Sequence, residues 1–299
     1  MRGGFATISH RYARANNPLV EGYDPPKPPS WLSYTDCNNL YGEAMSRPLS
    51  VRNFRFLSQE KIVDFDVMKI PTHSDSGYIV ECDLQYSPEL HDLHSDYPMA
   101  PEHLTVSPDM LSNFCHDIKA KNWKPMQKLV PNLLDKINYV CHYRNLQFYV
   151  KHGLVLSKIH RVISFDQKPW LEPWIAYCTE QRKIARDEFE SDFAKLQVNA
   201  TFGKTMEQVR HGVNVRLICD SNKLAKAVSR PTFRCAEIII DDLTLVRGTR
   251  QRVGFSILEV SKLMIYEFYY HYFKPKYLDR LLPMPYRGPT DRRLVPRPV

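Results

Sequence analysis

A helical pattern runs from Trp170 to Val209, with no glycine before Gly203. Within it, Lys195, Asn199 and Phe202 are spaced i, i+4 and i+7, so they share one face of the predicted helix. A cation and a flat aromatic ring on one helical face suit a ligand with phosphates at one end and a base at the other. The pattern therefore predicts a long helix with one face adapted to such a ligand.

A second informative segment, Asp36 to Gly42, begins 159 residues before Lys195. Asp36 is expected at the end of an apolar strand, Trp31–Tyr34, and is followed at once by an aromatic turn that contains Tyr41. A carboxylate on a separate strand suits the Mg²⁺ that bridges the phosphates of a nucleotide. By itself Asp36 could equally be a turn former or a helix cap. Its combination with Tyr41 and the helical segment favours the metal ligand.

Length and composition limit the class of protein. The chain has 299 residues, 43% hydrophobic and 25% charged, enough to bury a sizeable core in one or two domains. No stretch is apolar enough for a membrane span, and we expect no leader segment. The seven cysteines are odd in number and form no Cys-x-x-Cys pair, which favours a reduced intracellular compartment, without distinguishing cytoplasm from nucleus, and argues against structural zinc. His91 and His94 resemble a zinc pair by spacing, but we expect them to be structural, since His103 has no cysteine beside it.

The net charge of +8 is uneven along the chain. Residues 274–299 hold seven Lys or Arg against two Asp, which leaves only +3 for the first 273 residues. A role in binding nucleic acid therefore has to rest on where individual cations lie.

The remaining pattern mixes strands and helices, so α+β is the expected fold class. Residues 1–30 are predicted to be an extended, non-helical lead-in, and residues 60–165 to alternate short strands with loops. The tail, 278–299, contains five prolines and is predicted to be a disordered basic end. The individual elements expected are strands at Gly77–Leu84, Tyr139–Val150 and Glu237–Ile240, and a second helix at about Ser256–Phe273.

These residues resemble the protein-primed family B DNA polymerases, in particular those of Maverick/Polinton-type mobile elements and related linear plasmids and viruses. The resemblance covers about residues 1–277. Besides the two segments above it includes the runs Ile8-Ser9-His10-Arg11-Tyr12-Ala13, His91-Asp92-Leu93-His94-Ser95-Asp96-Tyr97-Pro98, Thr205-Met206-Glu207 and Ser256-Ile257-Leu258-Glu259-Val260-Ser261-Lys262.

The resemblance implies a palm-and-fingers fold with an insertion between the first motif, A, and the second, B. The thumb and exonuclease are expected to be absent. The implied parts are 1–59, a linker element and first palm segment; 60–165, an insertion that contacts the priming protein and the duplex; 166–205, the fingers; 206–277, a second palm segment; and 278–299, the tail.

The resemblance also implies roles for individual residues. In motif A, Asp36 ligates both catalytic metals, and Tyr41 stacks under the incoming sugar and excludes a 2′-OH. In motif B, Lys195 neutralises the triphosphate, while Asn199, Phe202 and Gly203 line the nascent base pair. Lys195 could also be an ordinary solvated cation, and Phe202 could be a core residue.

Further residues follow from the same resemblance. Lys183, with Arg182 beside it, matches a second triphosphate-binding lysine on the other fingers helix. Arg2-Gly3-Gly4 resembles the element that joins the exonuclease to the polymerase and holds the template strand, with Met1 where the family has tyrosine. In the insertion, the cations suited to phosphates are Lys119, Lys121, Lys124 and Lys128, for each of which a solvated helix end is an equal alternative.

The family's third motif, an Asp-Thr-Asp hairpin that supplies the second metal-binding carboxylate, is absent after Tyr277. The partial match in that region is Thr290-Asp291. Asp291 is flanked by Pro289 and Arg292-Arg293, which do not favour the required hairpin. We therefore expect a chain truncated before this motif, with Asp291 as the weak second candidate ligand.

Three functions are compatible with the sequence. The first is a DNA-directed DNA polymerase that uses dNTPs, a DNA primer-template and Mg²⁺ or Mn²⁺, with a terminal priming protein as a further implied partner and no membrane. The second is a non-catalytic remnant that holds DNA or nucleotide without turnover, which the missing motif favours. The third is a domesticated interaction protein, which no residue of the sequence specifically supports.

Overall fold

The computed structural model describes residues 2–3, 12–33, 37–71, 73–118, 123–207, 214–229, 233–240, 243–248 and 254–277. These residues form a mixture of helices and antiparallel strands, which confirms the α+β class. The strands are β1 (Leu49–Phe56), β2 (Ser76–Gln85), β3 (Glu102–Val106), β4 (Met126–Val130), β5 (Lys136–His142), β6 (Val155–Lys168), β7 (Asn214–Ile218), β8 (Phe233–Ile240) and β9 (Leu243–Gly248). The α-helices are α1 (Leu40–Ser46), α2 (Gln59–Val63), α3 (His91–His94), α4 (Asn113–Ile118), α5 (Tyr143–Lys151), α6 (Glu172–Lys183), α7 (Glu188–Met206), α8 (Ser221–Val228), α9 (Gly254–Glu267) and α10 (Lys274–Tyr277), with short 3-10 helices at Val67–Lys69, Pro88–Leu90 and Pro108–Met110.

The chain divides into two compact units. The first unit comprises residues 1–40, 53–166 and 258–299, and the second comprises 41–52 and 167–257. The chain passes between the units within α1, β1, β6 and α9. The division into palm, insertion and fingers expected from the sequence stays a prediction.

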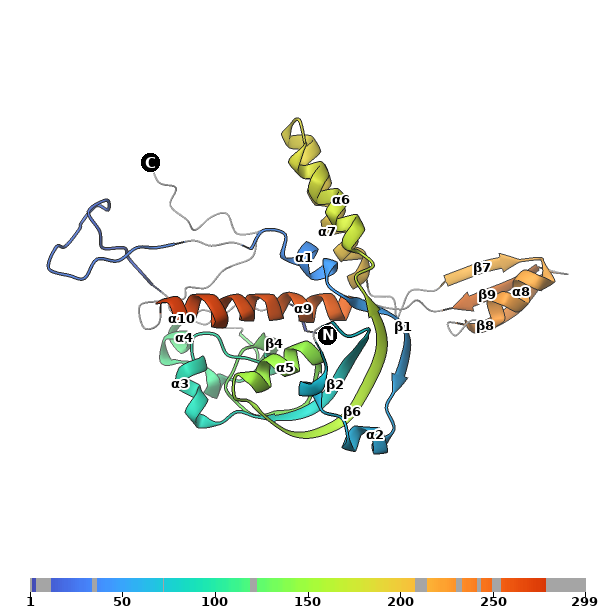
Figure 1. The fold of residues 1–299 in the computed structure, drawn as a ribbon, viewed down its shortest axis with the longest axis horizontal. Coiled ribbons are helices and arrows are strands. Elements are labelled where there is room, and N and C mark those ends of the chain that lie inside the picture. The colour runs from blue at the N-terminus through green and yellow to red at the C-terminus, as the bar shows by residue number, and fades with distance from the viewer. Residues whose placement is uncertain are drawn as a thin grey trace. The chain divides into compact units, whose positions relative to one another are not determined.

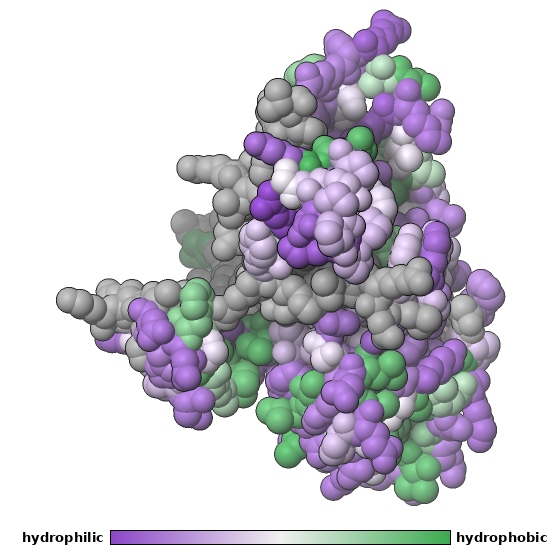
Figure 2. All heavy atoms as spheres, turned by 90° about the vertical axis from the view of Figure 1, so that its left-hand side faces the viewer, coloured by the Kyte–Doolittle hydropathy of each residue, from purple (hydrophilic) through white to green (hydrophobic). Residues whose placement is uncertain are grey.

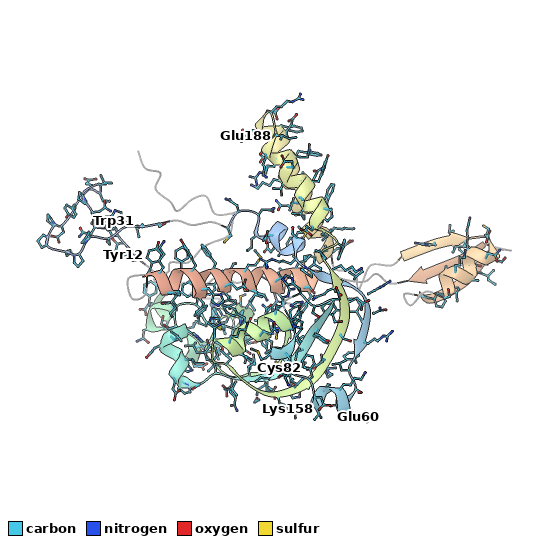
Figure 3. The ribbon with its side chains drawn as sticks, viewed as in Figure 1. Tyr12, Trp31, Glu60, Cys82, Lys158 and Glu188 are labelled. Carbon is cyan, nitrogen blue, oxygen red and sulfur yellow. The ribbon has the colours of Figure 1, made fainter. Side chains whose placement is uncertain are left out.

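The first unit is built around β2, in a sheet with the strand order β1-β6-β2-β5 (Figure 1). β2 runs antiparallel to both β5 and β6. Its alternate residues Val80, Cys82 and Leu84 are buried in the main hydrophobic cluster, as a half-buried strand requires (Cys82 is labelled in Figure 3). The strand predicted at 77–84 is therefore confirmed.

The strand predicted from Tyr139 to Val150 is wrong in its second half. β5 ends at His142, and residues Tyr143–Lys151 form α5. The aromatic residues of this run favour a strand by propensity alone. The helix forms because Tyr143, Leu146 and Tyr149 lie three residues apart and are all fully buried on one face.

The strand predicted at Trp31–Tyr34 is also not observed. Trp31, Leu32 and Ser33 belong to no strand, and the side chains of Trp31 and Leu32 are 67% and 59% exposed (Trp31 is labelled in Figure 3). The residue before this segment, Ser30, forms an isolated bridge with Asn16, but Trp31, Leu32 and Ser33 pair with no described strand. Tyr34 to Asp36 lie outside the described residues.

The other predicted elements are confirmed, with new boundaries. The helical region 170–209 is divided into α6 and α7, and the strand at 237–240 is the end of β8. The predicted second helix is α9 up to Glu267, after which Phe268–Phe273 continues as a π-helix. This aromatic turn is anchored by two hydroxyl groups: Tyr270 donates to Tyr97 O at 2.8 Å, and Tyr269 donates to Asp96 Oδ2 at 3.3 Å. Residues 278–299 lie outside the described part of the chain.

Hydrophobic residues also occur on the surface. In the view of Figure 2 they lie in small groups among hydrophilic residues. Single exposed side chains of this kind, such as Ile137 at 77%, are ordinary for a folded protein.

α9 carries a charged pair into the interior. Glu259 and Lys262 form an ion pair one turn apart, and their side chains are only 1% and 4% exposed. Asn145 of α5 donates to the backbone carbonyl of Glu259 at 2.9 Å, so the two helices are joined at this point. Removing one partner of a buried pair leaves the other charge in a low-dielectric interior.

We predict that Lys262→Ala lowers the free energy of unfolding by about 3–5 kcal/mol, because Glu259 is left without its counter-ion. Urea denaturation measures the change. The control is Lys69→Ala, since Lys69 pairs with Asp66 at 3.4 Å but its side chain is 84% exposed, and its loss should cost less than about 1 kcal/mol. Equal costs for the two variants would contradict the role given to the buried pair.

His94, whose ring lies 5.3 Å from that of Tyr270 in the π-helix, has the structural role expected for it. Tyr86 Oη lies 2.8 Å from His94 Nδ1, and the His94 side chain is fully buried. Burial, together with the nearby cations Lys274 and His152, lowers the pKa of His94 to about 4. Burial likewise lowers the pKa of His142 to about 3.

These lowered pKa values predict a loss of stability in mild acid. The unfolded chain, with an ordinary histidine pKa near 6.5, takes up protons before the folded chain does, so stability is complete above about pH 6.5 and falls as the pH is lowered toward 4. We expect the Tm to fall over this range, and His94→Gln to reduce the slope. The exposed His73, changed to Gln, serves as the control and should leave the slope unchanged. A Tm that is flat between pH 6.5 and 4 would contradict the assignment.

Candidate functional site

α6 and α7 lie side by side as a helical hairpin (Figure 1). The turn between them ends at Asp187, the N-cap of α7, whose side chain accepts from Glu190 N at 2.8 Å. Glu190 Oε2 in turn accepts from Arg186 N at 2.9 Å. This reciprocal arrangement resembles a capping box, which explains why the continuous helical pattern of the sequence breaks at this point.

One side of α7 packs against α6. Ala194 and Val198 are buried. Thr201 Oγ1 accepts from Trp174 Nε1 of α6 at 3.1 Å and donates to the carbonyl of Gln197 at 2.8 Å. These contacts set the rotation of α7 about its own axis.

A thiol adds to the same contact. Cys178 Sγ of α6 donates to Gln197 Oε1 at 3.7 Å. Burial raises the pKa of the Cys178 thiol, so it keeps the proton that it donates. The sequence did not single out Cys178, Gln197 or Thr201; the i, i+4 spacing of Gln197 and Thr201 was the available signal.

The predicted ligand face lies elsewhere on α7. At about 100° per residue, the centre of Lys195, Asn199 and Phe202 is turned by roughly 120° from the side that meets α6. Lys195 and Asn199 are exposed, and neither has a hydrogen bond or ion pair with any described residue. The shared face predicted from the sequence is therefore present and open at its cationic end.

Phe202 is covered by Tyr41, which comes from α1. The two rings are stacked, with centroids 4.0 Å apart and an interplanar angle of 9°. Both residues belong to the second unit and both are half-buried. The fold thus brings together two predicted site residues that are 161 positions apart in the chain.

The neighbouring candidates are also exposed. A Cβ added to Gly203 would meet no atom within 4 Å, so the protein leaves open space beside this residue. Arg182 and Lys183 occupy the last turn of α6, and Lys183 pairs with Glu180 at 3.3 Å. Lys195 lies seven residues, about 10 Å, along α7 from its start after the turn. Cations in the last turn of a helix also interact favourably with the negative end of the helix dipole. Stabilisation of α6 is therefore an alternative role for Arg182 and Lys183.

The segment Arg2-Gly3-Gly4, predicted to hold the template strand, is described only in part, and it belongs to the first unit. The Arg2 guanidinium lies 3.6 Å above the Tyr139 ring and donates to the carbonyl of Val140. A Cβ added to Gly3 would meet nothing within 4 Å. Gly4 lies outside the described residues, as do both predicted metal ligands, Asp36 and Asp291.

The described residues contain no group of three or more His, Cys, Asp or Glu side chains that could hold a metal ion. Of the cations predicted in the insertion, Lys124 precedes β4 and Lys128 belongs to it, both exposed, whereas Lys119 and Lys121 are not described. Within the described part of the chain, no helix is long and apolar enough to cross a membrane.

Comparison with known proteins finds no matching family model and no matching curated protein. Among solved structures, an orthorhombic crystal form of Phi29 DNA polymerase is similar with a TM-score of 0.39 and 13% identity, over 76% of this chain and 33% of that chain. The ternary complex of Phi29 DNA polymerase with primer-template DNA and incoming nucleotide gives 0.36 and 12%, over 87% and 36%. The binary complex with primer-template DNA gives 0.35 and 12%, over 76% and 32%. The similarity is distant, and this chain spans about a third of the length of the polymerase chains.

Proposed function

We propose that this chain binds a deoxynucleoside triphosphate through α7 and Tyr41, as the palm-and-fingers portion of a protein-primed family B DNA polymerase. The observation that supports the proposal most is the stack of Tyr41 on Phe202. It joins two segments, 161 residues apart in the chain, that the sequence analysis assigned together to one nucleotide site. Lys195 and Asn199 continue the same helical face toward solvent, where a ligand can reach them.

In this proposal each residue meets a different part of the nucleotide. Lys195 neutralises the triphosphate, with Lys183 and Arg182 as further cations at the turn between the helices. Phe202 stacks on the base, and the open space beside Gly203 admits the base pair without a steric clash. Tyr41 lies against the sugar, where its ring disfavours a 2′-OH.

The stack also sets a condition on binding. Rings whose centroids are 4.0 Å apart leave no space for a base between them. A base that stacks on the face of Phe202 now covered has to displace the ring of Tyr41. We propose that the base uses this covered face, so that nucleotide binding is coupled to a movement of Tyr41.

The reaction proposed is transfer of a nucleotidyl group from a dNTP to the 3′-OH of a DNA primer. Arg2-Gly3-Gly4 is proposed to hold the template strand, and a terminal priming protein is a proposed partner of residues 60–165. Mg²⁺ or Mn²⁺, held by Asp36 and a second carboxylate such as Asp291, would supply the charge neutralisation that phosphoryl transfer needs.

A second candidate function is binding without turnover. The missing third motif favours it, since a two-metal site needs at least two carboxylates on a rigid frame. The two functions share the nucleotide site and differ only in whether a primer is extended.

We predict that Lys195→Ala weakens dNTP binding by roughly 10–100-fold, the equivalent of one hydrogen bond to a charged group. Isothermal titration calorimetry with a dNTP measures the dissociation constant of each variant. The matched control is Lys204→Ala, because Lys204 is an exposed cation of the same helix, about 180° around from Lys195. Equal affinities of the two variants, or no dNTP binding by the unchanged protein, would overturn the proposed site.

Primer extension with dNTPs and Mg²⁺ or Mn²⁺ then separates the two functions. Extension that falls more than about a hundredfold in Asp36→Ala supports the polymerase. Binding of dNTP and primer-template without extension supports the non-catalytic alternative.

A further inference from the structure

The segment that follows α7 concentrates positive charge. Residues 208–253 hold nine Lys or Arg against four Asp or Glu, a net +5 in a chain whose total is +8. With residues 274–299 also at +5, the rest of the chain is slightly acidic. Outside residues 274–299, the excess of positive over negative charge therefore lies in this one stretch.

This stretch contains a small sheet covered by a helix. The strand order is β7-β9-β8, with β9 antiparallel to both neighbours. Ile218 of β7 and Ala227 of α8 form a small core with Leu224 and Phe233, which places α8 against one face of the sheet. Since side chains alternate along a strand, Arg216 lies on the same face as Ile218, toward α8.

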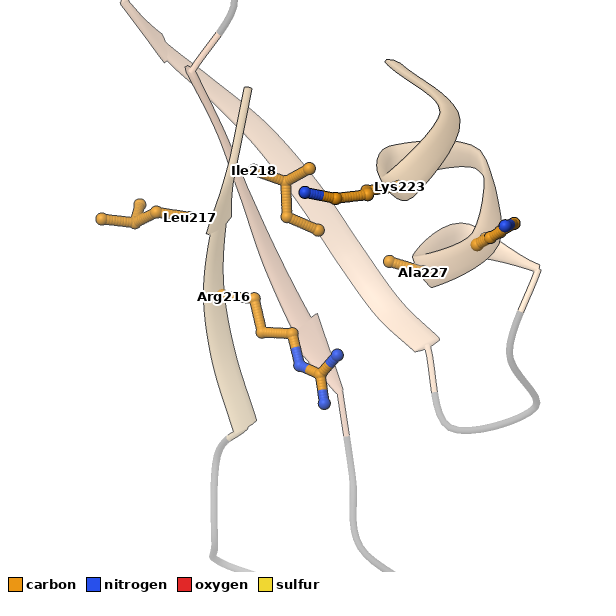
Figure 4. A pocket seen from close by; sticks show the side chains of 6 residues that line it. Arg216, Leu217, Ile218, Lys223 and Ala227 are labelled. Atoms are coloured by element: carbon orange, nitrogen blue, oxygen red, sulfur yellow. The ribbon is translucent and has the colours of Figure 1, made fainter. Parts of the chain in front are cut away.

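A hollow between β7 and α8 gathers three cations. Arg216 comes from the strand, while Lys223 and Lys226 are one turn apart on the helix. Figure 4 shows Lys223 extending from α8 toward Ile218, and Arg216 further along β7. The lining residues are Arg216, Leu217, Ile218, Lys223, Lys226 and Ala227.

The three charges are not neutralised by the described residues around them. All three side chains are exposed, and none forms an ion pair with a described residue. Asp220 is the N-cap of α8, and its carboxylate accepts from Lys223 N at 2.8 Å. Glu237 pairs through Leu245 with Leu217, so strand alternation places it on the opposite face of the sheet from Arg216.

We propose that this hollow binds phosphate groups of a nucleic-acid backbone. Two lysines at i, i+3 and an arginine on the facing strand offer several donors to successive phosphates, with Ile218 and Ala227 as an apolar floor. The contacts carry no base selectivity, because a backbone presents the same groups at every nucleotide. Affinity gained in this way depends steeply on salt.

A membrane surface with anionic lipids is a weaker match. A helix that lies on a membrane needs an apolar side to insert beside its cations. The apolar residues Leu224 and Ala227 of α8 are already packed on the sheet. On α8 the exposed large apolar side chain is Val228, at 40%, so this helix presents its cations with little apolar surface to insert into a bilayer.

The hollow is separate from the proposed nucleotide site. It lies on β7 and α8 rather than on α7, and it requires neither a metal nor turnover. Different variants test the hollow and the nucleotide site. Either proposal can therefore be contradicted while the other stands.

The test uses the full chain and a labelled single-stranded DNA of about 20 nucleotides, with chelator present and no dNTP. Fluorescence anisotropy follows binding from about 50 to 300 mM salt for the triple variant Arg216→Gln, Lys223→Gln, Lys226→Gln. Each lost phosphate contact on a single strand reduces the slope of log K against log salt by about 0.7, so we expect a slope reduced by about 2. At about 0.1 M salt this corresponds to binding weakened by roughly a hundredfold.

The matched control has the same change in net charge. Lys61, Lys69 and Lys151 are exposed cations of the first unit, and their triple change to Gln should alter the slope far less. The variant Arg216→Lys, Lys223→Arg, Lys226→Arg preserves charge and should keep most of the affinity, which separates loss of charge from misfolding. Equal slopes for the two Gln triples would overturn the proposal.

Two further probes distinguish the source of the phosphate. Inorganic triphosphate presents the same groups without a backbone, and a hollow built for nucleic acid should bind it more weakly than DNA. Triphosphate that binds as tightly as DNA, or phosphatidylserine vesicles that bind while DNA does not, would overturn the assignment to a backbone.

Discussion

The packing of α7 against α6 determines which residues of α7 are available to a ligand. Ala194, Val198 and Thr201 are used in the contact with α6. Because a helix turns about 100° per residue, this commitment leaves Lys195 and Phe202 on a different side. Phe202 is then covered by Tyr41, whereas Lys195 stays in solvent. In the proposed site, Lys195 is thus available to the phosphates and Phe202 to the base.

Much of this arrangement could be predicted from the sequence, because it depends on local periodicity. The i, i+4, i+7 spacing placed Lys195, Asn199 and Phe202 on one face, and the helix that carries them is present. The strand predicted at Trp31–Tyr34 and the second half of the one predicted at Tyr139–Val150 are wrong, because a strand forms only where a partner strand is available and α5 forms because one of its faces is buried. Neither condition is visible in a short run of residues.

The cationic hollow could not be predicted in the same way. Arg216, Lys223 and Lys226 belong to two elements, and their proximity follows from the docking of α8 on β7. The net charge of the whole chain does not reveal these three cations, because residues 274–299 carry +5 of the total of +8. The carboxylates of the predicted metal site, Asp36 and Asp291, lie outside the described residues, so that part of the prediction is untested.

The first unit depends on buried polar groups as well as on its apolar core. Glu259 and Lys262 neutralise each other inside α9, and Asn145 ties α9 to α5. α5 follows β5 directly, and the backbone of β5 accepts the hydrogen bond of Arg2. The anchoring of the first residues of the chain is therefore connected, through β5 and α5, to the charged pair in α9.

The most direct test of the nucleotide site is NMR of the protein with ¹³C-labelled tyrosine rings, in which Tyr41 is assigned by its loss in Tyr41→Phe. The ring current of Phe202 shifts the Tyr41 signals in the free protein, and Phe202→Leu removes that shift. We predict that a dNTP moves the Tyr41 signals toward their position in Phe202→Leu, because the base displaces the ring. Lys195→Ala should need a much higher dNTP concentration, and Lys204→Ala should not. Tyr41 signals that do not move at millimolar dNTP would contradict the account.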